Sequence, residues 1–527
     1  MDIEILVPIL FVAVAALASL ARWIDVPYPI VVVLGGLGIG FLPGMPEIEL
    51  DPDVVLLGFL PPLLYSAAFF ADLRALRDDA RALSMASIGL VLATMVTIAV
   101  ASHALIEGLS WPAAFALGAI VAPTDPVAAT AIMRRLGAPR RIVNVVEGES
   151  LVNDASALVA YRVAVAAAVG GSFSLLDAAG EFALAASGGL AIGIVVGLLS
   201  AELRERLDDP PLEIAVSLFT GYAAFLPAEQ LGLSGVLAAV TAGLIVGWRA
   251  PQIASPEVRL QGFAFWEILS FLLNAALFML IGLQLPLILD ELTNTSTVDA
   301  LGYAALISAL VIAIRFVWLF TTPYLVRVLD RRPSQVARRV GARERTLIGW
   351  SGMRGAVSLA AALALPLQTD AGAPFPERDL ILLITFGVIV VTLVGQGLTL
   401  PAVIRGLGLR DDGSDQVEEV RGRIEAAQAA LARLEELAEV EWTRDATVER
   451  VRRFYEYRRR RFAVRAGDMD DVDGIEESSL AYQRLMHELY AAQRAMLVQM
   501  RNRGEISNEV MHRIERDLDL EEARLEV

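Results

Sequence analysis

The chain has 527 residues, of which 56% are hydrophobic, and it carries a formal net charge of −17 at pH 7. So large an apolar fraction excludes an ordinary soluble protein of this length and indicates a helical membrane protein. The sequence contains no cysteine, which excludes disulfides and thiolate metal sites, and its acidic balance argues against a nucleic-acid partner.

Apolar runs long enough to cross a bilayer recur from Ile3 to Leu409, since a membrane helix needs about 20 such residues. The first run has no basic region before it and no clear cleavage site after it, so we expect a retained span rather than a signal peptide. The sequence predicts thirteen spans, at residues 3–21, 28–43, 54–71, 84–106, 111–133, 142–169, 181–201, 211–227, 233–248, 264–289, 300–326, 346–367 and 380–403.

The loops between these spans differ in charge. Arginines cluster in the loops that follow odd-numbered spans, whereas the loops after even-numbered spans hold almost none, Arg378 excepted. Cytoplasmic loops of membrane proteins carry an excess of basic residues. We therefore expect a multi-pass protein of the cytoplasmic membrane, with its N-terminus outside and its C-terminus in the cytoplasm.

The fifth span is interrupted near its midpoint by "APTDP", in which Pro123 and Pro126 bracket Thr124 and Asp125. Each proline lacks an N–H and crowds the preceding turn, so backbone carbonyls before it lose their helical partners. Freed carbonyls and a carboxylate at membrane depth are oxygen ligands suited to a small cation. A simple proline kink is the alternative, but it does not explain the aspartate.

The sixth span carries several polar residues in a largely apolar helix. Ser150 and Asp154 are four residues apart and share one face, whereas Glu149 and Asn153 share the neighbouring face. A charge at the bilayer centre costs at least about 2.5–3.5 kcal/mol, which makes such residues functional candidates. A structural polar network is the alternative for Glu149 in particular, and we expect Glu147, nearer the end of the span, to be solvated.

Two arginines lie at comparable depth, Arg315 in the eleventh span and Arg354 in the twelfth. Gly352 and Gly355 weaken the twelfth helix beside Arg354. A broken fifth span and a weakened twelfth span are corresponding elements if spans one to six and eight to thirteen form two repeats of opposite insertion. Paired broken helices in inverted repeats indicate a transport site.

The segments "APTDPVA", "EGESLVNDASALV" and "GMRGAVSLA", in this order, resemble the NhaP/NHE-type sodium–proton antiporters of the cation–proton antiporter-1 family, over roughly residues 5–405. The resemblance implies an all-α, NhaA-like antiporter fold with discontinuous helices five and twelve that cross at their unwound centres. It also implies a homodimer with a dimerisation domain, a six-helix ion-transporting core domain and elevator-like exchange of access.

The resemblance also implies roles for single residues. The ion ligands would be Thr124, Asp125, Ser150 and Asp154. Glu149 and Arg315 would form a structural ion pair held by Asn153, and Arg354 would offset the partial charges at the break of the twelfth helix. Electrogenic relatives carry aspartate at the position of Asn153.

These residues together predict an antiporter in which Na⁺ and protons compete for the same buried oxygens. The transported ions, Na⁺ (with Li⁺ as a further substrate) and H⁺, are its substrates, no cofactor is expected, and exchange is expected to be electroneutral with a role in pH and sodium homeostasis. The same fold carrying K⁺ is the closest alternative. A passive cation channel would need a continuous pore, and an intramembrane aspartyl protease would need a "GxGD" segment that the sequence lacks at membrane depth.

Beyond residue 409 the composition changes to charged, helix-favouring residues. Ile424, Leu431, Leu434 and Leu437 recur there at helical spacing. The sequence therefore predicts a transmembrane antiporter domain over residues 1–409 and a helical cytoplasmic tail with a regulatory role over residues 410–527.

Overall fold

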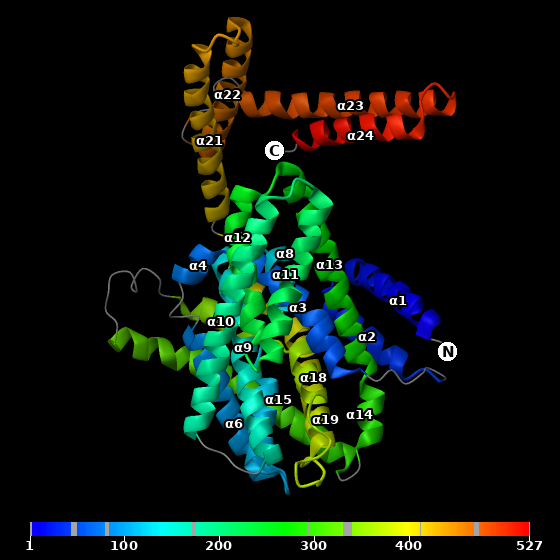
Figure 1. Cartoon of the computed structure of the whole chain (residues 1–527), viewed down its shortest axis with the longest axis vertical. Coiled ribbons are helices and arrows are strands. Elements are labelled where there is room, and N and C mark those ends of the chain that lie inside the picture. Colours follow the sequence, from blue (N-terminus) through cyan, green and yellow to red (C-terminus); the bar gives the residue numbers. More distant parts are fainter. Residues whose placement is uncertain are drawn as a thin grey trace. The chain divides into compact units, whose positions relative to one another are not determined.

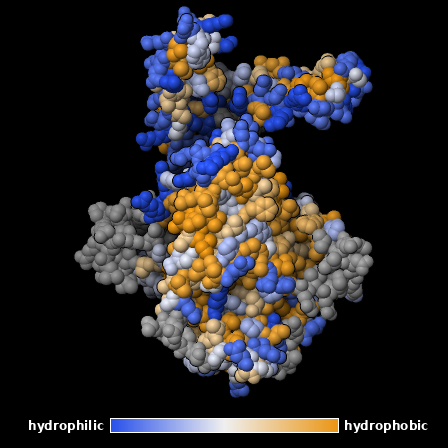
Figure 2. All heavy atoms as spheres, in the orientation of Figure 1, coloured by the Kyte–Doolittle hydropathy of each residue, from blue (hydrophilic) through white to orange (hydrophobic). Residues whose placement is uncertain are grey.

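The computed structural model describes residues 3–43, 50–78, 84–170, 175–292, 295–329, 340–411, 413–467, 469 and 474–525. It divides the chain into two compact helical units, Met1–Asp411 and Asp412–Val527 (Figure 1). The first unit contains almost all of the apolar runs. Hydrophobic residues cover broad parts of its visible face, whereas hydrophilic residues dominate the second unit (Figure 2).

The first unit is built from helices and short π-helical turns. They are α1 (Ile3–Trp23), α2 (Tyr28–Gly40), η1 (Val54–Phe59), α3 (Leu60–Phe69), α4 (Leu73–Asp78), η2 (Met85–Gly89), α6 (Leu90–Leu105), α7 (Trp111–Val121), α8 (Val127–Arg135), α9 (Arg140–Gly170), α10 (Leu175–Glu205), α11 (Pro210–Gln230), α12 (Gly235–Ile253), α13 (Pro256–Leu283), α14 (Leu285–Glu291), α15 (Thr297–Leu329), α17 (Ala342–Trp350), α18 (Ala356–Leu363), α19 (Arg378–Val390), η3 (Val391–Gln396) and α20 (Gly397–Leu407).

Helices occupy each of the thirteen ranges in which the sequence predicts a span. Eight stretches of the described residues are both long and apolar enough to cross a membrane: Ser87–Leu105, Arg140–Gly170, Ala179–Glu205, Pro210–Gln230, Gly235–Ile253, Pro256–Asp290, Thr297–Tyr324 and Arg378–Leu407. Four shorter apolar helices accompany them: Pro8–Trp23, Tyr28–Gly40, Val54–Phe69 and Trp111–Val121. The chain is therefore a polytopic helical membrane protein, while the count of thirteen crossings and the inverted repeats stay predictions.

The helices of the first unit pack in two groups. One group joins α1, α2, α3 and α10 to α13, in which α12 packs on α10 and α3 while α13 packs along α2. The other joins α6 to α9 with α15 and α17 to α20, in which α7 packs on α6, α9 and α19. Contacts across the boundary are fewer, chiefly of α9 with α3, α10 and α12 and of α18 with η1 and α13. This boundary positions the site described below.

The second unit consists of two helical hairpins, α21 (Ser414–Ala438) with α22 (Asp445–Ala466) and α23 (Ile475–Asn502) with α24 (Asn508–Ala523). Tyr490, Leu497, Met511 and Leu518 form the apolar core between α23 and α24. Beside that core, hydrogen bonds from Arg494 and then from His487 hold the pKa of the Glu522 carboxyl below its ordinary value.

Candidate functional site

Two helices of the first unit are interrupted, and their interruptions cross. The α-helix ends at Val121 in α7 and resumes at Val127 in α8, and it ends at Trp350 in α17 and resumes at Ala356 in α18. The backbone N–H of Asp125 donates to the carbonyl of Met353 at 2.8 Å, which joins the two irregular segments directly. The sequence therefore located both breaks, the first from its two prolines and the second from its glycines.

Arg354 lies at the C-terminal ends of both half-helices that lead into the crossing. Its Nε donates to the carbonyl of Val121 at 3.0 Å, and its Nη1 donates to the carbonyl of Gly352. Carbonyls at a helix C-terminus lack intrahelical partners and carry partial negative charge, so a guanidinium there is favourable. Arg354 was expected to offset the partial charges at the break of the twelfth helix, and the structure adds its contact with the end of α7.

Asp125 lies at the opposite, N-terminal ends. Its Oδ1 accepts a hydrogen bond from the N–H of Val127 at the start of α8, at 2.9 Å. Its Oδ2 packs so closely against Gly355, directly before α18, that a Cβ at that glycine would overlap it. Helix N-termini carry partial positive charge, so the crossing holds the carboxylate between two favourable ends. Gly355 is thus required for space as well as for the break.

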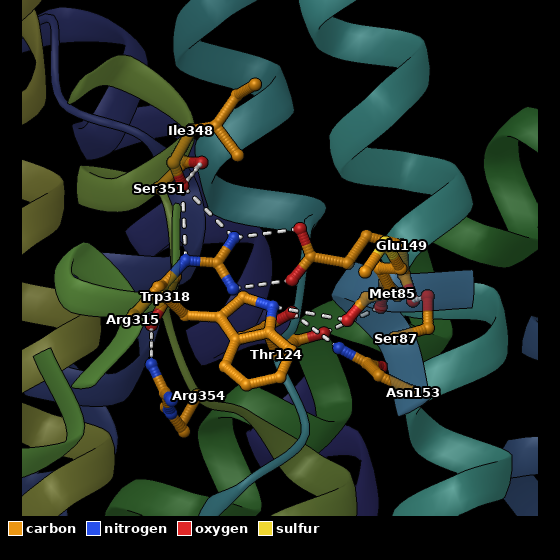
Figure 3. Close-up of polar contacts among 12 residues, drawn as sticks. Met85, Ser87, Thr124, Glu149, Asn153, Arg315, Trp318, Ile348, Ser351 and Arg354 are labelled. Atoms are coloured by element: carbon orange, nitrogen blue, oxygen red, sulfur yellow. Dashed lines mark hydrogen bonds and ion pairs between the residues drawn. The ribbon is translucent and has the colours of Figure 1, made fainter. Parts of the chain in front are cut away.

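Glu149 and Arg315 form an ion pair inside the protein (Figure 3). Arg315 Nη1 lies 2.5 Å from Glu149 Oε1 and Nη2 lies 3.0 Å from Oε2, so the pair is bidentate. The Arg315 guanidinium also donates to the carbonyl of Ile348 near the end of α17, at 3.0 and 3.2 Å. Each side chain is about 2% exposed. A Cβ at Gly352 would lie 2.6 Å from Arg315 Cδ, so this glycine too makes room for a charged side chain.

Asn153 does not hold this ion pair through any hydrogen bond among the described residues. Its Nδ2 donates instead to the hydroxyl of Thr124 at 2.7 Å, and its buried Oδ1 has no hydrogen-bond partner there. Ser150 Oγ donates to the carbonyl of Thr124 at 2.6 Å. Neighbouring faces of α9 thus both hold the irregular segment of the fifth span. The prediction that Asn153 holds the Glu149–Arg315 ion pair is wrong, because the Asn153 amide donates to Thr124 instead.

A cavity of about 330 Å³ lies at the boundary between the two helix groups. Pro123, Thr124, Asp125, Pro126, Ser150, Asp154 and Gly355 line it, together with residues of α3 and α13. Asp154 is 8% exposed, and its carboxylate accepts no hydrogen bond within the described part of the chain. Glu149 and Arg315 are absent from the lining of this cavity. The structure therefore separates the unpaired acid that faces the cavity from the paired acid behind it.

The cavity also has lining residues that sequence reasoning missed. Ser66, Ser270 and Asn274 line it from α3 and α13. Glu147 and Arg134 line it as well and pair with each other at 2.7 Å. A signal for Glu147 was present, because residues 147, 150 and 154 recur at helical spacing along one face of α9. The sequence gives no such signal for Ser66, Ser270 and Asn274, since isolated serines and an asparagine are ordinary in membrane helices.

The residues that line the cavity offer several kinds of oxygen atom. The lining includes the carboxylates of Asp125 and Asp154, that of Glu147 in its pair with Arg134, and the hydroxyls of Thr124 and Ser150, all of them hard oxygen ligands. The Ser150 hydroxyl donates its hydrogen bond to the carbonyl of Thr124, so the lone pairs of its oxygen can accept a cation. Within the described residues no group of three or more His, Asp or Glu side chains could hold a metal ion.

Residues 9–406 match the family model for the transmembrane part of the sodium/hydrogen exchangers. The chain belongs to this family. Its members are cation–proton antiporters, hence transporters rather than enzymes. The chain is 37% identical over 504 residues to an uncharacterized Na⁺/H⁺ exchanger of Mycobacterium tuberculosis, an alignment that covers 94% of this chain and 91% of that protein.

Two other relatives have more specific names. A sodium, potassium, lithium and rubidium/H⁺ antiporter of Bacillus subtilis is 34% identical over 76% of this chain and 61% of its own length. The Na⁺/H⁺ antiporter ApNhaP of Aphanothece halophytica is 34% identical over 80% of this chain and 78% of its own length. The solved structure of the sodium proton antiporter MjNhaP1 of Methanocaldococcus jannaschii, at 19% identity, has a TM-score of 0.59 over 77% of this chain and 99% of that one, which shows the same fold.

Proposed function

We propose that the chain exchanges Na⁺ for H⁺ across the cytoplasmic membrane, with Li⁺ as a further substrate, and that it serves pH and sodium homeostasis. The observation that carries this proposal is the cavity at the helix crossing, which Asp125 and Asp154 face together with Thr124 and Ser150. Two deep carboxylates with hydroxyl and carbonyl oxygens form a site that a cation and a proton can occupy in turn.

The proposed exchange depends on the different surroundings of the two acids. The Asp125 carboxylate has the N–H of Val127 and the two helix N-termini around it, so it can stay ionised. Asp154 has no partner of this kind, and a buried carboxylate without one favours either a proton or a bound cation. Entry of the cation would therefore release the proton, and entry of the proton would release the cation.

A count of the charges near the cavity supports electroneutral exchange of one Na⁺ for one H⁺. Glu149 and Arg315 cancel each other, and Arg354 faces the carbonyl end of α7 and the carbonyl of Gly352 just after α17. Asp125 is assigned to the helix N-termini, which leaves Asp154 as the one group that cycles. Asn153 is an amide and cannot carry a second proton.

The two helix groups support a proposal for access and assembly. We propose that the group with α7 to α9 and α17 to α20 moves as an elevator-like core against the group with α1 to α3 and α10 to α13, which would form the interface of a homodimer. The arginine-rich loops would face the cytoplasm, with the N-terminus outside and the tail inside. Membrane lipid surrounds both groups, and neither a cofactor nor a nucleic acid is part of the proposal.

A K⁺/H⁺ antiporter is the second candidate, because the named substrates of the Bacillus subtilis relative include potassium and rubidium as well as sodium and lithium. Oxygen ligands of the types found here do not by themselves separate Na⁺ from K⁺. A channel is less consistent with one deep site at a helix crossing.

The test is ion-driven proton movement in proteoliposomes that hold the purified full-length chain. A pH-sensitive dye should respond to Na⁺ and Li⁺ and less to K⁺. The Asp154→Asn variant should fold normally and lose exchange, because its amide cannot trade a proton for a cation, whereas Asp25→Asn at an exposed site should exchange as the wild type does. Normal transport by Asp154→Asn would overturn the site, and a larger K⁺ response would establish the second candidate.

Electroneutrality has its own measurement in the same vesicles. A potential imposed with potassium and valinomycin should neither drive nor slow the exchange of Na⁺ for H⁺. A rate that follows the imposed potential, or a current on a solid-supported membrane that scales with transport, would show that more than one proton moves per ion.

A further inference from the structure

The cavity has a charged pair at one end that the proposed exchange does not use. Arg134 in the last turn of α8 and Glu147 in α9 both line the cavity, and their Nη2 and Oε1 atoms lie 2.7 Å apart. The side chains are 64% and 35% exposed, in contrast to the buried Asp154. The pair therefore lies where the cavity meets solvent.

Glu147 and Asp154 lie on the same face of α9. Residues 147, 150 and 154 are separated by three and four positions, and all three line the cavity. Seven residues of α-helix rise about 10 Å, so the mouth pair lies about that far from the deep carboxylate. A cation that enters from this end passes Glu147 and Arg134 before it reaches Ser150 and Asp154.

The other arginines near this pair make interactions of their own. Arg135, the next residue of α8, donates to Asp25 at 2.6 Å and does not line the cavity. Arg140 and Arg141 at the start of α9 have interactions of their own and are likewise absent from the lining. Arg134 is thus the arginine of this loop region that a cation in the cavity meets, and Glu147 cancels its charge.

We propose that the Arg134–Glu147 pair sets the electrostatic potential at the cavity mouth, and with it the apparent affinity for the transported cation, without taking part in the exchange step. The inference rests on the proposed function. A lone arginine at the entrance would repel cations, and a lone glutamate would concentrate them, because a cleft lined by one sign of charge raises or lowers the local ion concentration. The pair holds the entrance close to neutral.

This role predicts that the two single variants change the KM for the cation in opposite directions. Glu147→Gln leaves Arg134 uncompensated and should raise the KM for the cation about three- to tenfold, while Arg134→Gln should lower it by a similar factor. The double variant should return to within about twofold of the wild type. The maximal rate should change little in all three, because Asp154 and its surroundings are untouched. Added impermeant salt should shrink both shifts, since solvated charges are screened.

The experiment measures the KM and maximal rate in everted membrane vesicles, which present the arginine-rich loops to the bath, with whichever cation the wild type exchanges. Arg135→Gln is the matched control, because it removes the same charge one residue away from the cavity lining, and it should leave the KM unchanged. The charge-swapped variant Arg134→Glu with Glu147→Arg should restore the wild-type KM. Such a recovery would show that the shifts in the single variants come from charge and not from misfolding.

The outcomes separate this inference from the proposed function. A wild type that shows no ion-driven proton movement overturns the exchange itself. A wild type that exchanges normally, with single variants that shift the KM in the same direction, that lower only the maximal rate, or that match Arg135→Gln, overturns the role of the mouth pair.

Discussion

Three acidic residues near the helix crossing show how the surroundings of a carboxylate decide its use. Glu149 is fully paired with Arg315, Asp125 lies against helix N-termini, and Asp154 faces the cavity without a hydrogen-bond donor in the described chain. A buried charge needs compensation, which a permanent partner or a transient ion can supply. Under the proposed function, Asp154, which lacks a permanent partner, is therefore the residue that exchanges.

The Glu149–Arg315 pair should support the fold rather than bind the ion. Glu149→Gln or Arg315→Gln leaves one buried charge unpaired, which typically costs about 3–5 kcal/mol. Each single variant should therefore unfold at a clearly lower temperature, and the double variant should lose less than the sum of the two. Thermal unfolding of the four proteins in detergent gives the double-mutant cycle, and strict additivity would argue against the pair.

At the scale of elements, the two interrupted helices work as one structure. Their irregular segments share a backbone hydrogen bond. Arg354 donates to the carbonyl at the end of α7 and to that of Gly352 just after α17, and Asp125 lies at the starts of α8 and α18. Each charge therefore offsets the partial charges of two half-helices instead of one. A change at either break acts on both helices.

Gly355→Ala should disrupt this crossing. The new Cβ would overlap Asp125 Oδ2, so the carboxylate has to move away from the start of α18. We expect exchange to fall by at least about tenfold, since misplacing a reacting group by about 1 Å can cost a hundredfold. Gly302→Ala, where a Cβ would meet nothing within 4 Å, is the control in the same dye assay. Equal activity of the two variants would contradict the described packing.

At the scale of the whole molecule, the chain consists of a membrane unit and a helical tail with its own core. The cavity and all the residues assigned to exchange lie in the first unit, and the family match ends at residue 406. The first unit should therefore be able to exchange ions alone, with the tail in a regulatory role.

Removal of the tail tests this division. A chain that ends at Arg410 should still exchange Na⁺ for H⁺ in proteoliposomes, with a changed response to pH. The full-length protein, purified in the same way, is the control, and size-exclusion chromatography checks that both have the same oligomeric state. A truncated protein that is folded and assembled but inactive would make the tail part of the mechanism.

The sequence by itself determined the class of the protein, the approximate places of its apolar helices and the positions of both breaks. Hydropathy, prolines and glycines act locally along the chain, so their consequences can be derived without coordinates. It also placed Ser150 and Asp154 on one face and Glu149 on the next, because helical spacing alone decides this.

Only the tertiary structure decided which residues meet across helices. It brought Asn153 to Thr124 instead of to the ion pair, extended the contacts of Arg354 to Val121, and aligned Glu147 with Arg134 at the cavity mouth. It also showed that Gly352 and Gly355 leave room for Arg315 and Asp125. Such contacts join residues distant in sequence through close packing, and no local pattern along one helix contains the distance to its neighbour.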